Sequence, residues 1–490
     1  MEQRTVLIQS LHDSPLELVF VLSGGGSLVL GDLLTVPGAS RTLIEATVPY
    51  AEESLHRYIG RVPEQCCCQR TARYMAMTAF HRGLRYIKNK KGKHSFITNP
   101  LNPLSIDVSH EIDDTRFYAK NTVEKLEEDD LDDYAHLMGV ACTASLVTDR
   151  DKKGDYRFHI ATQTLHRTIV FSLQLTKNAR TRQEEERLLA DTILNAIETT
   201  RLESVSPTVS PAFSTPSNES GTGEPGTQGT NLPLCKTFGA GTTSHFPIRE
   251  VLPLDLKPGE TIQGKQVIGS PPLVELFFGK VQAVLWKNGA IQYFKLHPPL
   301  PKQQPASTDY NRLQQNEWTQ AIFPGSFNPI HKGHLEMIGI AEQRLGNQVA
   351  LEISIQNVDK PPLDYIELEY RLHEIEKTRP EQAVWFTRTP LFEDKSEIFS
   401  GTTFIVGADT LRRFANLQFY HENTHQLHDV LRLIAFHNCR FLVFARQGHR
   451  GIESLETMNI PDMLRSLCDE IPPTTFAMNI SSSDFRRNEF

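Results

Sequence analysis

The segment from residue 321 to residue 346 constrains the fold of this 490-residue chain more than any other segment. The run AIFPG at residues 321–325 is apolar and ends in Pro and Gly, which predicts a buried strand that enters a turn. Apolar residues then recur at helical spacing, and Gly346 is placed to end the helix; they are Leu335, Ile338, Ala341 and Leu345. The sequence therefore predicts a strand, a tight turn and a helix in immediate succession.

The turn itself reads GSFNPIHKGHL, residues 325–335. A turn at a helix start directs free backbone N–H groups and the positive end of the helix dipole outward, where they can hold a phosphate. Gly333 has no side chain to block a close approach. His331 and His334 flank it, and imidazole donors can stabilise the charge that spreads over phosphate oxygens during phosphoryl or nucleotidyl transfer. The segment therefore predicts a nucleoside triphosphate site.

GSFNPIHKGHL resembles the HxGH signature of the nucleotidylyltransferase superfamily. Members of that superfamily join a nucleoside monophosphate unit to a phosphorylated acceptor and release pyrophosphate. The resemblance implies that His331 and His334 are catalytic and that five further residues bind the nucleotide: Gly325, Ser326, Phe327, Asn328 and Gly333. The alternative is a helix start that contains two histidines by chance.

A second run, ISSSDFR at residues 480–486, resembles the ISSTxxR motif of the same superfamily, with Ser483 in place of the usual threonine and Phe485 in place of isoleucine. The resemblance implies that Ser481, Ser482 and Ser483 hold phosphate oxygens, and that the Arg486 guanidinium binds the leaving pyrophosphate. An ordinary helix cap or tail is the alternative. Because the sequence ends at Phe490, we expect the helix after this motif to be little more than one turn.

Two shorter signals lie between these motifs. GADT, residues 407–410, resembles the GAD motif of pyridine-nucleotide adenylyltransferases, which implies that Gly407 and Asp409 bind the nucleotide and that Asp409 meets the adenosine ribose. As an alternative, Asp409 caps the following helix. Lys360, in NVDKPPL, stands where related adenylyltransferases have a lysine that reaches the triphosphate, and a surface lysine in a proline-rich loop is its alternative.

The region around these motifs predicts an α/β fold with a parallel sheet. Strand patterns occur at residues 349–355, 404–407 and 440–446, and a helical stretch lies around residues 367–377. Strands that alternate with helices favour a parallel sheet whose sites lie at the carboxyl ends of its strands. We therefore expect a Rossmann-like nucleotidylyltransferase domain at residues 319–490.

A segment rich in Ser, Thr, Pro and Gly, residues 204–245, is predicted to be a disordered linker, because it has too little apolar surface to fold alone. It follows a first domain, residues 1–203, that ends in an amphipathic helix. Residues 246–318 form a small β-rich connecting segment in this interpretation, with a hairpin turn at Asn288 and Gly289.

The first domain has a resemblance of its own. The run from Leu22 to Leu55, the predicted helix at residues 72–76, and GVACTAS at residues 139–145 are similar to the CinA C-terminal domain, a family that includes nicotinamide-mononucleotide amidases. The similarity spans the whole region and implies a CinA-like α/β domain. By position, Ser23 matches the nucleophilic serine of the family and Tyr50 its active-site tyrosine.

Departures from that family pattern bear on activity. The lysine expected five residues after Tyr50 is Leu55, and Leu146 and Val147 replace the usual Gly-Pro of the phosphate loop. A serine hydroxyl is a weak nucleophile unless a base activates it, so we expect the amidase activity to be lost. A nucleotide-binding or dimerising role remains consistent with the fold. His56 is a substitute base in one interpretation and a helix-surface histidine in the other.

Composition narrows the class of protein. A net charge of −8 argues against a nucleic-acid-binding or membrane-surface protein. The seven cysteines form neither a disulfide framework nor a CxxC zinc pattern, and no metal-ligand motif stands out, so no protein-bound metal is predicted. The N-terminus has no secretory pattern and the chain has no membrane span, which makes the cytoplasm the expected compartment. ATP chemistry of this kind implies Mg²⁺ bound to the phosphates.

Several functions remain open. The first is an enzyme of NAD biosynthesis that transfers AMP from ATP to nicotinamide or nicotinate mononucleotide. The alternatives are a bifunctional enzyme that also deamidates nicotinamide mononucleotide, a non-catalytic nucleotide-binding sensor, and a cytidylyl- or pantetheine-phosphate adenylyltransferase. The expected partners are these small molecules, with a homo-oligomer as a further possibility. Acceptor specificity depends on pocket contacts that these motifs do not contain.

Overall fold

The computed structural model describes residues 2–91, 131–149, 153–205, 235–236, 246–294, 319–356, 362–416, 424–448 and 451–476. It divides into two compact units. Unit 1 comprises Met1–Leu232, Phe238–Val274 and Val358–Glu367, and unit 2 comprises Pro233–Thr237, Glu275–Asn357 and Leu368–Phe490. Within the described ranges, no helix is both long enough and apolar enough to span a bilayer.

Unit 1 is built on a mixed six-stranded sheet with the order β2-β1-β3-β4-β5-β7. Its strands are β1 (Glu17–Ser23), β2 (Leu43–Thr47), β3 (Leu137–Ser145), β4 (Tyr156–Gln163), β5 (Arg167–Leu175) and β7 (Gln263–Ile268). β1 runs parallel to β2 and β3, whereas β3, β4, β5 and β7 pair antiparallel. β1, β3 and β5 are buried along nearly their whole length, as expected for strands with both faces covered.

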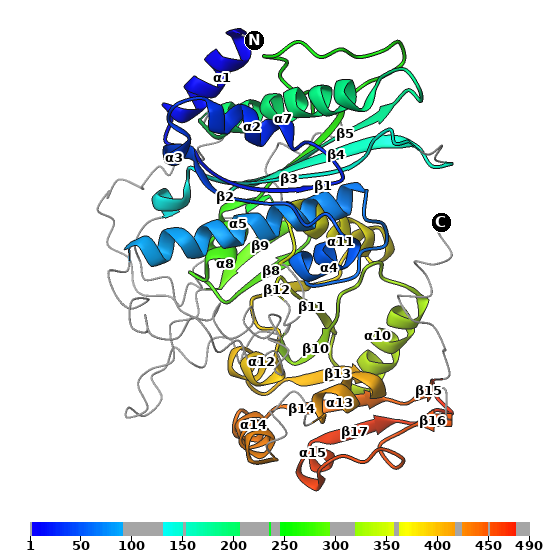
Figure 1. Cartoon of the computed structure of the whole chain (residues 1–490). Coiled ribbons are helices and arrows are strands. Elements are labelled where there is room, and N and C mark those ends of the chain that lie inside the picture. Colours follow the sequence, from blue (N-terminus) through cyan, green and yellow to red (C-terminus); the bar gives the residue numbers. More distant parts are fainter. Residues whose placement is uncertain are drawn as a thin grey trace, which may run out of the picture. The chain divides into compact units, whose positions relative to one another are not determined.

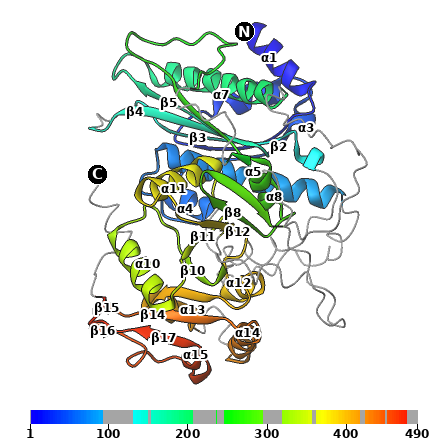
Figure 2. The same ribbon diagram turned by 180° about the vertical axis from the view of Figure 1, so that it is seen from behind.

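Helices cover the two faces of this sheet (Figures 1 and 2). The helices of unit 1 are α1 (Glu2–His12), α2 (Leu28–Thr35), α3 (Ala39–Thr42), α4 (Glu52–Ile59), α5 (Gln69–Lys91) and α7 (Arg182–Val205), with a 3-10 turn η1 at Leu131–Tyr134. α2 and α7 lie on one face and α5 on the other. α5 approaches β3 so closely that a Cβ on Gly139 would lie 2.3 Å from the Ala76 carbonyl oxygen. Glycine is therefore required at that crossing.

Unit 2 is built on a nine-stranded sheet with the order β17-β14-β13-β10-β11-β12-β8-β9-β6. Its central strands are β10 (Ala321–Pro324), β11 (Ala350–Ser354), β12 (Val384–Thr387), β13 (Thr403–Gly407), β14 (Arg440–Phe444) and β17 (Cys468–Ile471), and all of these pair in parallel. β8 (Ala283–Lys287), β9 (Ala290–Phe294) and β6 (Cys235–Lys236) extend the sheet antiparallel beyond β12. A short hairpin, β15 (Arg446–Gly448) and β16 (Gly451–Glu453), stands apart.

The helices of unit 2 connect its parallel strands. They are α10 (Lys332–Leu345), α12 (Phe392–Ile398), α13 (Ala408–Phe414), α14 (Thr424–Phe436) and α15 (Asp462–Ser466). α8 (Pro271–Phe278) and α11 (Tyr365–Thr378) begin in unit 1 and continue in unit 2. α10 ends at Gly346, whose φ of 70° is a left-handed conformation that glycine adopts without strain. The predicted strand, turn and helix at residues 321–346 are therefore confirmed.

The strand order of unit 2 places a topological switch point between β10 and β13. The chain passes from β10 to β11 and β12 on one side, then returns to place β13 and β14 on the other side of β10. The first helical connections thus leave the sheet in opposite directions at the carboxyl ends of β10 and β13, where open α/β sheets bind their ligands. The predicted Rossmann-like parallel sheet is confirmed. Its switch point lies beside two segments of the sequence, HKGH at residues 331–334 and GADT at residues 407–410.

Of residues 246–318, which the sequence predicts as one connecting segment, the structure describes residues 246–294, and strands of this part belong to both sheets. β7 is the edge strand of the unit 1 sheet, next to β5, and β8 and β9 form a hairpin in the unit 2 sheet. The hairpin turns at Asn288 and Gly289, with φ angles of 52° and 75°, as the Asn-Gly pair predicts. β6, at Cys235–Lys236, lies inside the predicted linker and pairs with β9.

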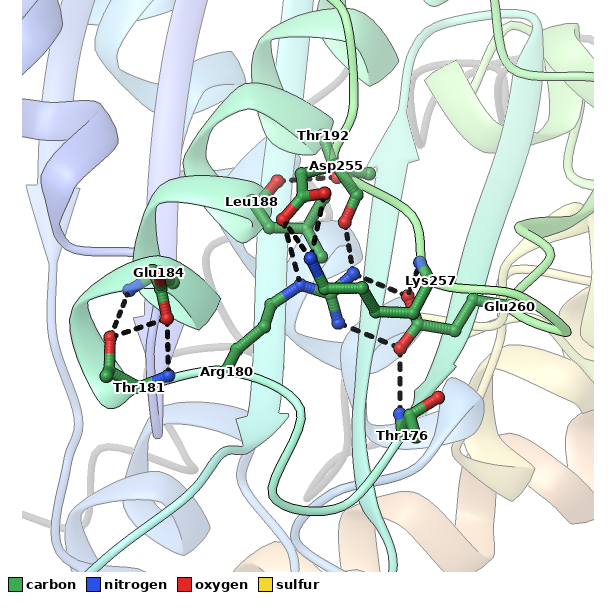
Figure 3. Close-up of polar contacts among 9 residues, drawn as sticks. All are labelled: Thr176, Arg180, Thr181, Glu184, Leu188, Thr192, Asp255, Lys257 and Glu260. Carbon is green, nitrogen blue, oxygen red and sulfur yellow. Dashed lines mark hydrogen bonds and ion pairs between the residues drawn. The ribbon is translucent and has the colours of Figure 1, made fainter.

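A buried ion pair fixes the chain before β7 to the rest of unit 1 (Figure 3). The Arg180 guanidinium donates to both carboxylate oxygens of Glu260, at 2.8 and 2.6 Å, and both side chains are almost completely buried. Glu260 also accepts from the backbone N–H groups of Thr176 and Lys257. Burial alone would raise the pKa of Glu260, but these donors lower it to about 2. The Glu260 side chain is therefore ionised in the folded protein and stabilises this part of unit 1.

Candidate functional site

The turn after β10 is shaped by contacts with its neighbours. The Gly325 N–H donates to the Glu352 carbonyl oxygen at 2.9 Å, which continues the pairing of β10 with β11. Phe327 adopts a φ of 42° and buries its ring completely. A Cβ on Gly325 would lie 2.7 Å from that ring. Arg371, on α11, donates to the Ser326 carbonyl oxygen at 3.0 Å. The turn is therefore held in place before any ligand arrives.

The two predicted catalytic histidines lie against each other at the start of α10. His331 is the last extended residue before the helix, and the Nδ1 atom of His334 accepts a hydrogen bond from the His331 backbone N–H at 3.3 Å. Their rings are stacked, with centroids 3.6 Å apart. Gly333, between them, is buried. The structure thus brings together the two imidazoles that the HxGH pattern singles out.

The protonation of His334 follows from its surroundings. Its ring meets the rings of Phe323 and Phe327 edge to face, at centroid distances of 5.8 and 5.1 Å. Burial, with a smaller contribution from His331, lowers the pKa of His334 to about 3. The imidazole is therefore neutral at pH 7, and because Nδ1 accepts a hydrogen bond, the proton is on Nε2. His334 thus offers a fixed N–H donor rather than a cation.

The GADT segment lies at the end of the neighbouring strand. Gly407 ends β13 in an extended conformation, and Asp409 lies in the first turn of α13. The Asp409 carboxylate folds back over the strand end, so that a Cβ on Gly407 would lie 2.6 Å from its Oδ1 atom. Asp409 is half-buried. Gly407 is therefore the residue that lets this carboxylate take its position next to the switch point.

Five predicted site residues lie outside the described residues: Lys360, Ser481, Ser482, Ser483 and Arg486. Of the remaining ones in unit 2, Ser326 and Asn328 belong to the turn between β10 and α10, and Asn328 is buried. The structure therefore gathers the first motif and GADT at one edge of the sheet.

Sequence reasoning missed a buried charge pair beneath this edge. Glu352, on β11, and Lys395, on α12, are almost fully buried and lie 2.7 Å apart, Nζ to Oε1. The Thr387 hydroxyl also donates to Glu352, and Lys395 also donates to the Thr389 carbonyl oxygen. The available signal was a glutamate inside an otherwise apolar strand, since such a residue is rarely buried without a partner. Arg371 was missed as well, because its target is a backbone carbonyl.

In unit 1, the residues that match the amidase pattern do not form an activated nucleophile. Ser23 ends β1, and its hydroxyl donates to the Pro49 carbonyl oxygen at 3.1 Å. A hydroxyl that gives its proton to a carbonyl is not activated by a base. Tyr50 is 67% exposed, and Leu55, at the position of the expected lysine, is 1% exposed and belongs to the core. GVACTAS lies within β3 and is therefore not a loop.

Carboxylates of α7 accept hydrogen bonds from backbone N–H groups at two turns of unit 1. The Gly26 N–H, at the turn into α2, donates to Glu186 at 2.7 Å, and the Val147 N–H donates to Glu185 at 2.6 Å. Arg182 adds a contact to the Gly24 carbonyl oxygen at 3.0 Å. The Val147 N–H, at the position where the resemblance implies a phosphate loop, is thus already used by a carboxylate of the chain, and this geometry does not favour the predicted amidase alternative.

Comparisons with known proteins gave one match to a family model and matches to solved structures. Residues 322–488 match the family model described as Cytidylyltransferase-like. No curated protein matches the sequence. Among solved structures, the competence/damage inducible protein CihA from Agrobacterium tumefaciens is 16% identical over 41% of this chain and 93% of its own, with a TM-score of 0.25. A competence-damaged protein (CinA) superfamily protein from Escherichia coli is 12% identical over 42% of this chain and 88% of its own, also with a TM-score of 0.25.

Proposed function

We propose that the cytidylyltransferase-like domain at residues 322–488 transfers AMP from Mg·ATP to nicotinamide or nicotinate mononucleotide and releases pyrophosphate. The observation that carries this proposal is the meeting of the HKGH turn and GADT at the carboxyl ends of β10 and β13, which are neighbours at the switch point of a parallel sheet. A site for a nucleoside triphosphate needs backbone N–H donors for the phosphates and a hydrogen-bond acceptor for the ribose hydroxyls. In our proposal the HKGH turn provides the donors and GADT provides the acceptor.

The proposed reaction is a displacement at the α-phosphorus of ATP. An oxygen of the acceptor phosphate forms a bond to this phosphorus, while the bond to the pyrophosphate oxygen breaks. Negative charge increases on the phosphate oxygens in the transition state. The protein contributes by positioning the two substrates and by stabilising this charge electrostatically. His334 offers its Nε2–H to this charge without cost in reorganisation, because its tautomer is set by the His331 N–H. Mg²⁺ bound together with ATP would supply further charge stabilisation.

The choice of ATP over CTP is supported by GADT. In our proposal Asp409 accepts hydrogen bonds from the ribose hydroxyls, and the backbone at Gly407 allows the nucleoside to approach the sheet edge. Lys360, Arg486 and the serines at 481–483 would hold the triphosphate and the leaving pyrophosphate, as their motifs imply. Our proposal of a pyridine acceptor rests on the resemblance of GSFNPIHKGHL together with GADT to pyridine-nucleotide adenylyltransferases.

A direct assay tests the proposal. Purified full-length protein is incubated with Mg²⁺, either ATP or CTP, and one of three acceptors: nicotinamide mononucleotide, nicotinate mononucleotide or phosphopantetheine. Pyrophosphate and the joined product are quantified. We expect a dinucleotide from ATP and a pyridine mononucleotide, and its loss in His331→Ala. His373→Ala, which removes an exposed histidine from α11, is the matched control and should retain activity.

The other outcomes each reject part of the proposal. Product from CTP alone would make the enzyme a cytidylyltransferase, and product from phosphopantetheine alone would replace the acceptor. Binding of ATP without pyrophosphate release from any pair would reject catalysis and favour a sensor. Equal rates in His331→Ala and His373→Ala would remove the HKGH turn from the reaction.

A further inference from the structure

Unit 1 contains a cluster of metal-ligand side chains that the proposed reaction does not use. Glu52, His56 and Cys66 each offer one ligand atom, a carboxylate oxygen, an imidazole nitrogen and a thiol sulfur, and these atoms lie within 4.8 Å of one another. Glu52 and His56 are one turn apart on α4 and therefore project from the same face. Cys66 reaches them from the loop that follows the helix. This convergence was not visible in the sequence, because no CxxC or HxxxH spacing marks it.

His56 has no hydrogen-bond partner for its buried Nε2 atom. The Glu52 Oε1 atom is 3.7 Å away, too far for a hydrogen bond. Burial of an unsatisfied polar nitrogen has a cost, and such atoms in folded proteins usually have a partner that the protein atoms alone do not show. A cation between the three donors would satisfy this nitrogen. The competing explanation is a plain i,i+4 pair on a helix surface, which would not require a thiol at the same point.

The position of Cys66 is fixed by the sheet rather than by the cluster. The Thr143 hydroxyl, on β3, donates to the Cys66 carbonyl oxygen at 2.7 Å. Arg157, on β4, donates to the Cys67 carbonyl oxygen at 3.2 Å. At the other end of the loop, Gly60 ends α4 with a φ of 64° and turns the chain back. The third donor is therefore anchored to a rigid element, as a binding site requires.

The chemistry of the donor set indicates which cation fits. The ligand set of one oxygen, one nitrogen and one sulfur suits Zn²⁺, which accepts all three donors, better than Mg²⁺ or Ca²⁺, which take oxygen ligands.

We propose that Glu52, His56 and Cys66 form a Zn²⁺ site on unit 1, with a fourth position left for water or another ligand. A tetrahedral zinc site with bonds of about 2.0–2.3 Å separates its ligand atoms by roughly 3.3–3.8 Å, so the side chains need to close by about an ångström. Glu52, whose side chain is 74% exposed, can make that movement freely. Three protein ligands with an open position are the pattern of zinc sites that bind a further molecule.

The experiment measures zinc binding, with no dependence on enzyme activity. Full-length protein is stripped with a chelator, dialysed under reducing conditions, and titrated with Zn²⁺ against a chromophoric competitor. We expect one tight equivalent, and a loss of affinity of more than about 100-fold in Cys66→Ser, because even substitutions outside the ligand shell weaken such sites 10–100-fold. Glu52→Gln and His56→Ala should weaken the same equivalent. Glu53→Gln, which changes the adjacent exposed carboxylate on α4, should not.

Cobalt gives an independent readout of the ligands. Co²⁺ bound at this site should show a thiolate-to-metal charge-transfer band that Cys66→Ser removes and Cys68→Ser keeps. Glu52→Gln changes an exposed side chain, so a folding defect cannot explain its effect, and thermal unfolding of the stripped variants checks the others. An unchanged zinc stoichiometry and affinity in all three variants, or the absence of any tight equivalent in the wild-type protein, would overturn the proposal.

Discussion

Individual side chains at the HKGH turn owe their chemistry to their immediate neighbours. His334 is neutral because aromatic rings and His331 surround it, and it is a donor at Nε2 because its Nδ1 is already used. The same sequence in a solvated turn would carry histidines with pKa values near 6.5. The HxGH pattern therefore identifies His334, whereas the packing around the ring makes it a neutral hydrogen-bond donor.

A substitution series at His334 tests this role. His334→Ala should lower kcat by about 10²–10³-fold, the usual cost of removing one preorganised donor from a transition state. His334→Gln, whose amide can place an N–H near the Nε2 position, should recover part of the loss. Because the pKa is about 3, kcat should show no step from this residue as the pH rises from 5 to 8. Steady-state kinetics from pH 5 to 8 provide the measurement. The role would be refuted if kcat of the wild-type protein showed a step with an apparent pKa near 6.5 and this step were absent from His334→Gln.

At the scale of elements, a buried ion pair connects α12 to β11. Lys395 and Glu352 are nearly inaccessible to solvent, and each has a second hydrogen-bonding contact. A pair of this kind adds little net stability compared with apolar residues, but the loss of one partner leaves a buried charge without compensation. The two elements should therefore separate more easily when only one partner is replaced.

Lys395→Met should destabilise unit 2 by about 3–5 kcal/mol, and the double variant with Glu352→Leu should cost less than the sum of the two single changes. Urea unfolding followed by tryptophan fluorescence measures this, since the buried Trp286 and Trp385 both belong to unit 2. Lys377→Met removes an exposed charge from the end of α11 and is the control, with an expected change below about 0.5 kcal/mol. Strict additivity of the two substitutions would contradict a coupled pair.

At the scale of the whole molecule, residues 246–262 pass from the predicted linker into the first sheet, and Glu260 holds them there. Its pKa in the folded state, about 2, lies below its ordinary value of 4.5. A lowered carboxyl pKa contributes stability that is complete above pH 4.5 and is lost as the pH falls toward 2. The shift corresponds to roughly 3 kcal/mol for this buried group.

Glu260→Gln should therefore release residues 246–262 at neutral pH, because the buried Arg180 loses its charged acceptor. Hydrogen exchange of peptides from this segment, followed by mass spectrometry, should show faster exchange than in the wild-type protein. Glu250→Gln, in an exposed position of the same segment, is the control. Unchanged exchange in Glu260→Gln would mean that the packing of β7 against β5 is enough to hold the segment.

The amino-acid sequence by itself determined the identity of the elements around the proposed nucleotide site. The helix of residues 332–345, its end at Gly346, the strands at β11, β13 and β14, and the Asn-Gly hairpin all follow from patterns within a few residues. Their prediction succeeds because hydrophobic period, turn conformation and helix capping are local effects. The alternation of strands with helices along the chain also favoured a parallel sheet with its sites at the carboxyl ends of the strands.

Only the tertiary structure decided which distant groups meet. It divided residues 246–294 between two sheets, placed Glu186 on the Gly26 N–H, paired Glu352 with Lys395, and brought Cys66 to the face of α4 that carries Glu52 and His56. No local sequence pattern connects the members of these pairs. The physical reason is that charge pairing, desolvation and metal-ligand convergence depend on distance in space, and the packing of whole elements sets that distance.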